Sequence, residues 1–530
     1  MTEFKPLIQQ PDRAPPSAPA GGGIGRAVLS AWYILIIFFA TALTLVAPQH
    51  LSRPFLAGGV VLGTMIFLGQ CVYHATGPRP INWLSIDILF MLIFLMIHLT
   101  YPLFFCLGQI GATETKVWFN YRVVCQGTMM SVAGLAAFGL GFNLLADRYH
   151  HGRGSLGLPV AALWKWEKVG KGIFLGGVVV MVVFVLLLGR ELFAGEYALT
   201  RRLGYAATVL WIGFRSLLFT GFALLTVSVA QLTGKFKIGT VPKVFLVGFV
   251  VFMGVFGSRD TVGMIVLIVA GAYAEHIKAI SLKKLVVALV AGLLVFSLIR
   301  VARAVPERSL TAVLDAIRGK SGHVSVLGGL VEIGNSAQTL YASLGAVPEQ
   351  YGYFLGKLWY TGIIGLVPFA NRLLPELGLS QYANTGTLVT FIMYGKVPGE
   401  HVAGAGASII ADFYLNFGLP GVLVGMLGLG VLAKGVQQKA RSGASIVWMV
   451  AYVVLIPALC IVARNSAVML VRTALWPALL VFVAGWLFQL PRSARLLRYF
   501  PAAVAAPGSV GPPVGEGAVA DGNVLEGEMR

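Results

Sequence analysis

The sequence predicts an all-α, polytopic transmembrane protein with about 12 helical spans and one large loop on the outer side of the membrane. Of its 530 residues, 57% are hydrophobic and only 12% are charged, whereas soluble domains carry about 25% charged residues. Apolar runs near 20 residues recur along the chain, and an α-helix needs about this length to cross a bilayer. The runs are continuous rather than alternating, which disfavours a transmembrane β-barrel.

The apolar runs define where the spans are expected. They cover approximately residues 28–47, 55–73, 86–106, 123–145, 172–189, 205–231, 244–257, 261–275, 285–299, 406–436, 445–463 and 467–488. The two short runs beside Ser258-Arg259-Asp260 cross the membrane only if this polar tripeptide lies at the interface or in a wet cavity.

The distribution of basic residues predicts the orientation. The loops and termini on one side carry more than twice as many Lys and Arg residues as the short loops on the other, and basic loops favour the cytoplasm. Both termini are therefore predicted to be cytoplasmic. The expected organisation is a disordered tail at 1–27, helices at 28–299, an outer loop with amphipathic helices at 300–405, helices at 406–488, and a basic and then disordered tail at 489–530.

The composition also excludes several classes of function. The net charge of +19 is explained by topology and by anionic lipid, so no nucleic-acid partner is expected. The four cysteines lie in or beside apolar runs without metal-type spacing, and we predict neither a metal nor a cofactor. A P-loop and a nucleotide-sugar motif are absent from the sequence, which disfavours ATP-driven transport and a cytoplasmic sugar-nucleotide transferase.

Arginines near the outer helix ends are the main candidates for chemistry. Arg215 lies well inside an apolar run, where a charge must be paired or face a wet cavity. Arg259 lies between two short runs, and Arg300 and Arg303 share a helix face if the preceding helix continues. Guanidinium groups suit phosphate or pyrophosphate because each planar fork gives bidentate, charge-assisted hydrogen bonds. The alternatives are ion pairs, such as Arg259 with Asp260, and solvated positions at the interface.

Charged residues also flank the last predicted spans. Arg464 is expected at the membrane interface. Arg472 lies about one turn inside the last span and needs a partner such as Asp412 or a ligand anion. Asp412 itself lies within an apolar run, and we interpret it as an arginine partner rather than a free base.

His401 and Glu400 precede the glycine-rich turn Gly404-Ala-Gly406, which leads into an apolar helix. Either side chain would serve as a general base if it is held near a substrate hydroxyl. The alternative for His401 is a structural or solvent-exposed role, which is common for single histidines in loops. We take His401 as the first candidate for a base and Glu400 as the second.

The stretch 404–421 resembles the signature of bacterial oligosaccharide repeat-unit polymerases, the O-antigen polymerases of the Wzy family. It contains a Gly- and Ser-rich turn, an acid at Asp412, then Tyr414 and Asn-Phe-Gly ending at Gly418. Ser258-Arg259 also resembles a Ser-Arg element that recurs in these polymerases and in O-antigen ligases. Asp412 departs from the pattern, because many relatives have Glu there.

This resemblance implies a glycosyltransferase of the GT-C type in the bacterial inner membrane, with its site on the periplasmic side. The enzyme would transfer the growing glycan from undecaprenyl pyrophosphate to a new lipid-linked repeat unit. The product would be O-antigen, capsule or exopolysaccharide. The implied partners are the lipid-linked donor and acceptor and the membrane lipids, and the resemblance also suggests a chain-length regulator and a flippase.

Together, the residues and the resemblance lead to an assignment of roles. Arg259, Arg300 and Arg303 are expected to bind the pyrophosphate, with Arg215 and Arg464 as further contacts. His401 or Glu400 would be the base. Tyr414 and Trp359 would stack on sugar or pack in the core, and Asp412 and Arg472 would form charged pairs near the site.

Two other functions are compatible with these features. An O-antigen ligase would use the same lipid carrier to move the polymer to another acceptor, and the Asp-Phe-Tyr-Leu-Asn-Phe-Gly stretch favours the polymerase. A transporter or lipid-linked oligosaccharide flippase without catalysis would also explain charges inside the membrane. A flippase is expected to show pseudo-symmetry and short loops on both sides, whereas this sequence has no repeat and one dominant outer loop.

Overall fold

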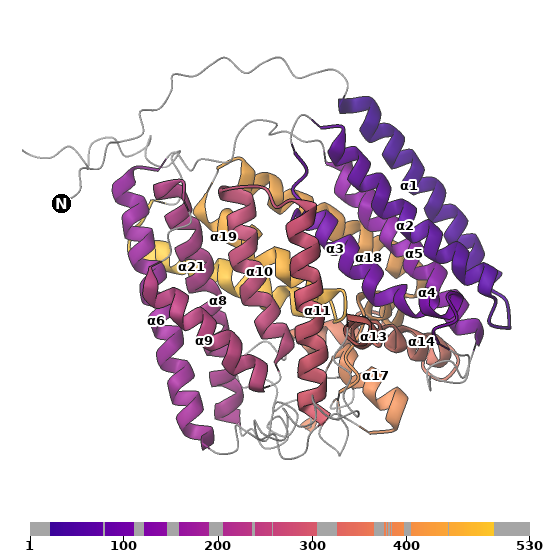
Figure 1. Ribbon diagram of the computed structural model, residues 1–530. Coiled ribbons are helices and arrows are strands. Elements are labelled where there is room, and N and C mark those ends of the chain that lie inside the picture. Colours follow the sequence, from indigo (N-terminus) through magenta and orange to yellow (C-terminus); the bar gives the residue numbers. More distant parts are fainter. Residues whose placement is uncertain are drawn as a thin grey trace, which may run out of the picture.

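The computed structural model of the protein describes residues 22–77, 80–110, 121–145, 158–189, 205–235, 239–256, 258–304, 326–364, 376–377, 379, 382, 384–396, 404–443 and 445–491. Within these segments the regular secondary structure is helical throughout (Figure 1). The predicted all-α class is therefore confirmed for the described part of the chain.

The long helices fall on the predicted apolar runs. In chain order the elements are α1 (Gly22–Leu45), α2 (Arg53–Ala75), α3 (Ile86–His98), α4 (Thr100–Cys106), α5 (Tyr121–Leu144), α6 (Val160–Leu188), α8 (Tyr205–Thr233), α9 (Thr240–Phe256), α10 (Arg259–His276), α11 (Leu282–Ala304), α13 (Val326–Gly334), α14 (Ala337–Ala346), α15 (Lys357–Ile364), α17 (Thr385–Tyr394), α18 (Ile409–Arg441), α19 (Ile446–Val462), α20 (Val468–Leu470), the π-helical turn η5 (Val471–Leu475) and α21 (Trp476–Leu487).

Seven helical segments in the described part of the chain are long and apolar enough to cross a membrane. They are α1, α2, α5, α6, α8, α18 and the continuous segment from α20 to α21. The pair α3 and α4, which is bent by 54°, would make an eighth. The expected number of about 12 spans is not confirmed, because α9, α10, α11 and α19 are not among the described segments that combine the length and the apolar character of a span.

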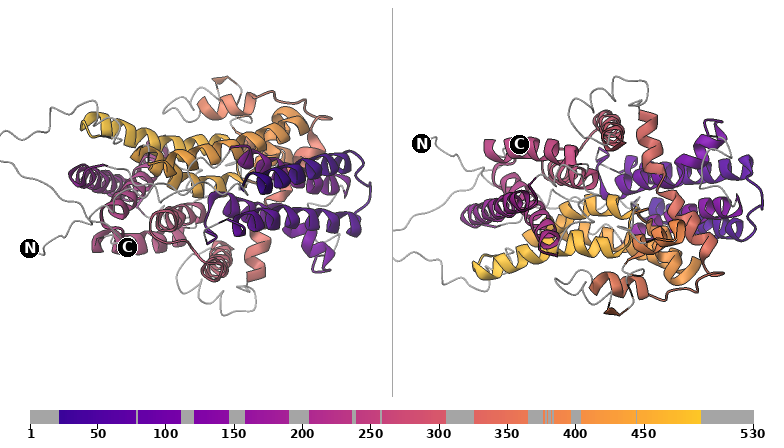
Figure 2. Two further views of the ribbon diagram at one scale, coloured as in Figure 1. Left: turned by 90° about the horizontal axis from the view of Figure 1, so that it is seen from above. Right: turned by 90° about the horizontal axis from the view of Figure 1, so that it is seen from below.

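The helices form two adjoining groups with separate apolar cores, which Figure 1 shows side by side and Figure 2 shows from above and below. One group contains α1, α2, α3, α5 and α18, and the other contains α6, α8, α9 and α10. The buried helix α19 serves both cores. Its Tyr452 and Leu455 belong to the first core, while Met449 and Val453 belong to the second. α19 therefore joins the two groups.

Helices α5 and α18 pack closely because glycines lie at their contact. A Cβ atom on Gly141 would lie 2.0 Å from the carbonyl oxygen of Leu427, and one on Gly430 would lie 2.2 Å from that of Phe138. Small residues let helix backbones approach in a membrane, where helix association depends on van der Waals packing rather than on the hydrophobic effect. This contact holds the first group together.

Helix α18 is interrupted and does not form one straight span. Gly418 has φ 68° and ψ −159°, so two helical parts meet at this residue. A Cβ atom there would also lie 3.1 Å from the ring of Tyr353, and only glycine adopts this backbone conformation easily. Pro420 lacks the N–H group that would continue the helical hydrogen bonds. The predicted span at 406–436 is therefore divided.

Short helices from the predicted outer loop cover one end of the bundle. We call this the loop end; it is the lower end in Figure 1, where α13, α14 and α17 lie. α13 packs on α4 and α11, α14 packs on α5 and α18, and α15 packs on α20. The described part of the 300–405 segment thus lies against the helical bundle and does not form a separate domain.

The contact between α5 and α18 leads to a test within one helix. Gly430→Ala is expected to lower the free energy of unfolding by roughly 1–3 kcal/mol, because the added methyl group has no space. Gly428→Ala is the matched control, since a Cβ atom at Gly428 has no neighbour within 4 Å. The thermal midpoints of the detergent-solubilised variants compare the two. Equal midpoints would show that α5 and α18 do not pack as described.

Candidate active site

Arg215 of α8 and Asp260 of α10 form an ion pair, with 2.8 Å between Nη2 and Oδ2. The hydroxyl of Ser258 donates a hydrogen bond to Asp260 Oδ1 at 2.9 Å, and it lies 2.8 Å from the hydroxyl of Thr261. Ser258 and Thr261 are fully buried, whereas 38% of the Asp260 side chain and 15% of the Arg215 side chain are exposed. One buried hydroxyl group, that of Ser258, thus binds a carboxylate that remains partly exposed.

Arg215 lies well inside α8, whereas its partner Asp260 is the second residue of α10. Arg215 is ten residues beyond Tyr205, the first residue of α8, which is about 15 Å along the helix axis at 1.5 Å per residue. The guanidinium carbon of Arg215 lies 5.1 Å from the ring centroid of Trp211 and 5.8 Å from that of Phe219. Aromatic faces stabilise a guanidinium that has little contact with water. The position of Arg215 within an apolar run predicted that it needs a partner. The structure shows that this partner is Asp260.

Arg472 brings a second positive charge to the pair. It lies in the π-helical turn η5, and its charge interacts with those of both Arg215 and Asp260. Pro477 follows this turn and lacks the N–H group that would continue regular α-helical bonding. Two arginine charges within electrostatic range of one carboxylate leave an excess positive charge. We call Arg215, Asp260 and Arg472 the arginine site, and its charge favours an anionic ligand.

The structure describes the other predicted arginines only in part. The backbone places Arg259 at the first residue of α10, beside Asp260, and it places Arg300 and Arg303 near the end of α11. The side chains of these three arginines lie outside the described part of the structure. Arg464 lies between α19 and α20 and is partly exposed.

The two predicted general bases, His401 and Glu400, lie outside the described residues. Among the residues that the structure does describe, no group of three or more His, Cys, Asp and Glu side chains is placed to hold a metal ion. The structure does describe the side-chain interactions of the arginine site, which is therefore the candidate site for the chemistry.

Asp412 is fully buried and has partners other than the expected Arg472. Its Oδ2 accepts hydrogen bonds from Trp359 Nε1 and from the backbone N–H of Ala467, both at 2.9 Å. Its Oδ1 accepts a hydrogen bond from the hydroxyl of Thr385. We call these four residues the Asp412 cluster. The three donors belong to α15, to α17 and to the start of the last helical segment, so one carboxylate connects three parts of the loop end.

The chain before α15 closes over the interruption in α18. The N–H groups of Phe354 and Leu355 donate to the carbonyl oxygens of Leu415 and Asn416, both at 2.9 Å. The N–H of Gly356 donates to the side-chain oxygen of Asn416 at 3.1 Å. Carbonyl groups at the end of a helical part need such partners. The Asn-Phe-Gly part of the sequence motif thus forms a helix end that another segment caps.

The two aromatic side chains considered for sugar contact both pack within the protein. The hydroxyl of Tyr414 donates to the carbonyl oxygen of Val347 at 2.9 Å, and its ring lies edge-on to that of Tyr353. The ring of Trp359 lies edge-on to that of Phe417, with 5.2 Å between centroids. Tyr414 is 8% exposed, so its role in this structure is packing.

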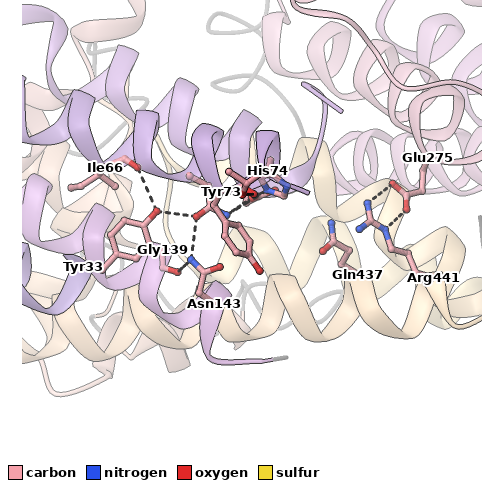
Figure 3. Close-up of polar contacts among 12 residues, drawn as sticks. Tyr33, Ile66, Tyr73, His74, Gly139, Asn143, Glu275, Gln437 and Arg441 are labelled. Atoms are coloured by element: carbon pink, nitrogen blue, oxygen red, sulfur yellow. Dashed lines mark hydrogen bonds and ion pairs between the residues drawn. The ribbon is translucent and has the colours of Figure 1, made fainter. Parts of the chain in front are cut away.

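A second polar network (Figure 3) involves the end of α2 and the start of α3, towards the upper end of the bundle in Figure 1 and opposite the loop end. The buried carboxylate of Asp87 lies 2.5 Å from Nε2 of His74 and accepts a hydrogen bond from Gln70 Nε2 at 2.6 Å. Gln70 Oε1 in turn accepts hydrogen bonds from Tyr33 and Asn143 at 2.9 and 3.1 Å. Helices α1, α2, α3 and α5 are thereby linked by side chains that the sequence analysis did not single out.

An ion pair at the same end connects the two helix groups. Arg441 at the end of α18 donates to both oxygens of Glu275 near the end of α10, at 2.5 and 3.1 Å (Figure 3). Nearby, Gln437 Nε2 donates to the hydroxyl of Tyr452 at 3.2 Å. Bidentate pairs of this kind fix geometry as well as charge. We interpret this network as structural, because the arginine site lies towards the other end.

The fold and the arginine site define a class of protein. It is a multi-pass, α-helical membrane protein with an excess positive charge between its helices and a cover of short helices at one end. A family model described as O-antigen polysaccharide polymerase Wzy matches residues 28–490. The chain therefore belongs to this family, and the resemblance found in the sequence is confirmed. The comparisons found no matching curated protein and no matching solved structure.

The ion pair between α10 and α18 can be tested by a double-mutant cycle. Glu275→Ala and Arg441→Ala are each expected to lower the free energy of unfolding by about 1–3 kcal/mol, because each removes both hydrogen bonds of this largely buried bidentate pair. The double variant should cost less than the sum of the two effects. Thermal unfolding of the detergent-solubilised variants measures this. Fully additive losses would mean that the two side chains do not interact.

Proposed function

We propose that the protein is a GT-C-type glycosyltransferase that polymerises oligosaccharide repeat units carried on undecaprenyl pyrophosphate. It transfers the growing glycan to a new lipid-linked repeat unit at the periplasmic face of the bacterial inner membrane, with both termini in the cytoplasm. Membership of the Wzy family supports polymerase activity. The single structural observation that carries the proposal is the arginine site, in which Asp260 pairs with Arg215 and also interacts electrostatically with Arg472.

The arginine site has the chemistry that a pyrophosphate leaving group requires. In the reaction the hydroxyl oxygen of the acceptor forms a bond to the anomeric carbon of the donor sugar. The bond from that carbon to the pyrophosphate oxygen breaks, its electron pair stays on the pyrophosphate, and the hydroxyl proton passes to a base. Guanidinium groups that are held in place stabilise this charge best, because they need not reorganise as the charge develops.

Asp260 supplies this preorganisation for Arg215. It accepts one hydrogen bond from an Nη of Arg215, and Ser258 holds the other oxygen of the carboxylate. The rest of the guanidinium fork is then available for an anion. The single negative charge of Asp260 compensates only one of the two arginine charges. Because the charge of Arg472 remains in excess, the site attracts a pyrophosphate anion.

Further residues complete the proposed site. Arg259 is next to Asp260 in the chain, and Arg300 and Arg303 end α11, which contacts α9; we assign these three to pyrophosphate contacts, with Arg464 as an additional contact. We assign the general base to His401, with Glu400 as the alternate. A chain-length regulator and a flippase are the partners that this pathway suggests.

Deletion of the gene tests the reaction in the cell. We expect long glycan chains to disappear while single repeat units are still made, and analysis of the surface and secreted polysaccharide measures this. Polymer that is made but not attached would identify a ligase instead. Lipid-linked units that accumulate facing the cytoplasm would identify a flippase.

Substitutions in the arginine site test the catalytic role. Arg215→Ala and Arg472→Ala are each expected to lower the polymerisation rate by about 10²–10³-fold, the usual effect of removing one donor to a developing negative charge. Lysine at either position should recover only part of the rate, because it lacks the planar fork. Arg122→Lys is the control, since Arg122 is exposed at the start of α5. Unchanged chain lengths in both alanine variants at equal protein level would refute the assignment.

A further inference from the structure

The Asp412 cluster and the arginine site are parts of one connected structure. Ala467, whose N–H binds Asp412, is the N-cap residue of α20. From α20 the helical backbone continues through η5 into α21 without a break. Arg472 is only five residues beyond Ala467, which is about one and a half helical turns. The carboxylate of Asp412 therefore binds the start of the helical segment that carries Arg472.

The physical effect of Asp412 at this position is to fix a helix start. The first N–H groups of a helix have no partner within it, and a carboxylate beside them is favoured by the helix dipole. The N–H of Ala467 is such a group, and Asp412 Oδ2 accepts its hydrogen bond at 2.9 Å. The side chain of Asp412 is 0% exposed, so water does not compete for this bond.

A π-helical turn lies between this fixed helix start and α21. Arg472 lies within this turn, η5, and single π turns inside helices are rare and frequently occur at functional sites. The Asp412–Ala467 bond holds the backbone on the N-terminal side of the turn, and α21 continues the helix on its other side.

The same carboxylate also binds two parts of the cover at the loop end. Trp359 of α15 and Thr385 of α17 both donate to it. A movement of α15 or α17 that displaces Asp412 would thus change the position of Ala467. The cluster thus links the cover to the helical segment that carries Arg472.

We propose that Asp412 is a positioning residue for the polymerase: through the N–H of Ala467 it holds the last helical segment so that Arg472 faces the Arg215–Asp260 pair. This inference rests on the proposed function of the arginine site. It gives the acid of the sequence motif a role that differs from that of an arginine partner and from that of a base.

The test uses the full-length protein in membrane vesicles, supplied with lipid-linked repeat units isolated from a strain that lacks the polymerase. Initial polymerisation rates are measured against substrate concentration, and inhibition by inorganic pyrophosphate is measured in parallel. Asp412→Asn is expected to lower kcat by about tenfold or more and to weaken inhibition by pyrophosphate. Asp412→Glu should recover part of both, since it keeps the carboxylate.

A second variant removes the donor and leaves Asp412 unchanged. Ala467→Pro deletes the N–H group, and the φ of −58° at Ala467 suits proline. It should reproduce the loss seen with Asp412→Asn. Thr385→Val removes a donor to the other oxygen of the same carboxylate and leaves the Asp412–Ala467 bond in place. It is expected to lower the rate less than Ala467→Pro does, and Arg122→Lys again serves as the control.

The decisive measurement combines the substitutions. If Asp412 acts through Arg472, adding Asp412→Asn or Ala467→Pro to Arg472→Ala should change the rate by less than about twofold. Independent, multiplying losses would overturn the proposal. So would an unchanged kcat in both Asp412→Asn and Ala467→Pro when only the thermal midpoint falls, because the cluster would then be purely structural. If Arg472→Ala itself has no effect, the proposed function of the arginine site fails instead.

Discussion

The arrangement of the loop end depends on the buried carboxylate of Asp412. A buried carboxylate is stable only when its oxygens accept several hydrogen bonds, and here the donors include the indole of Trp359, the hydroxyl of Thr385 and the N–H of Ala467. Each donor belongs to a different segment. The hydrogen bonds that this one buried carboxylate needs therefore bring together the cover helices α15 and α17 and the start of the last helical segment.

The same requirement for polar partners applies at the arginine site, where the charge that needs partners is the positive charge of Arg215. Arg215 is deep in α8, and its charge is retained because Asp260 and two aromatic rings replace water. Asp260 in turn depends on the buried hydroxyl of Ser258. The addition of Arg472 leaves an excess positive charge that a pyrophosphate would neutralise. Charges inside a membrane protein are costly to keep, and for this reason they indicate function.

Much of the helical structure could be predicted from the sequence. Local hydropathy indicated the positions of the long helices, and it placed the boundary between α9 and α10 at Ser258-Arg259-Asp260, as the structure does. The division of α18 was missed, because hydropathy is insensitive to the backbone angles of a glycine. Gly418 followed by Pro420 is the signal that would have indicated it. The count of about 12 spans is not confirmed, because seven or eight helical segments in the described part of the chain combine the length and the apolar character of a span.

The sequence alone determined the class of protein, the family and the residue types of the candidate site, because hydropathy, charge bias and short motifs are local properties. It indicated that Arg215, Arg472 and Asp412 each needed a partner. Only the tertiary structure decided the partners: Asp260, 45 residues from Arg215, and the N–H of Ala467, 55 residues from Asp412. Such pairs depend on which helix faces pack together and on where a π turn directs a side chain. A backbone N–H, moreover, is present at every residue except proline, so no sequence pattern could mark Ala467 as the donor.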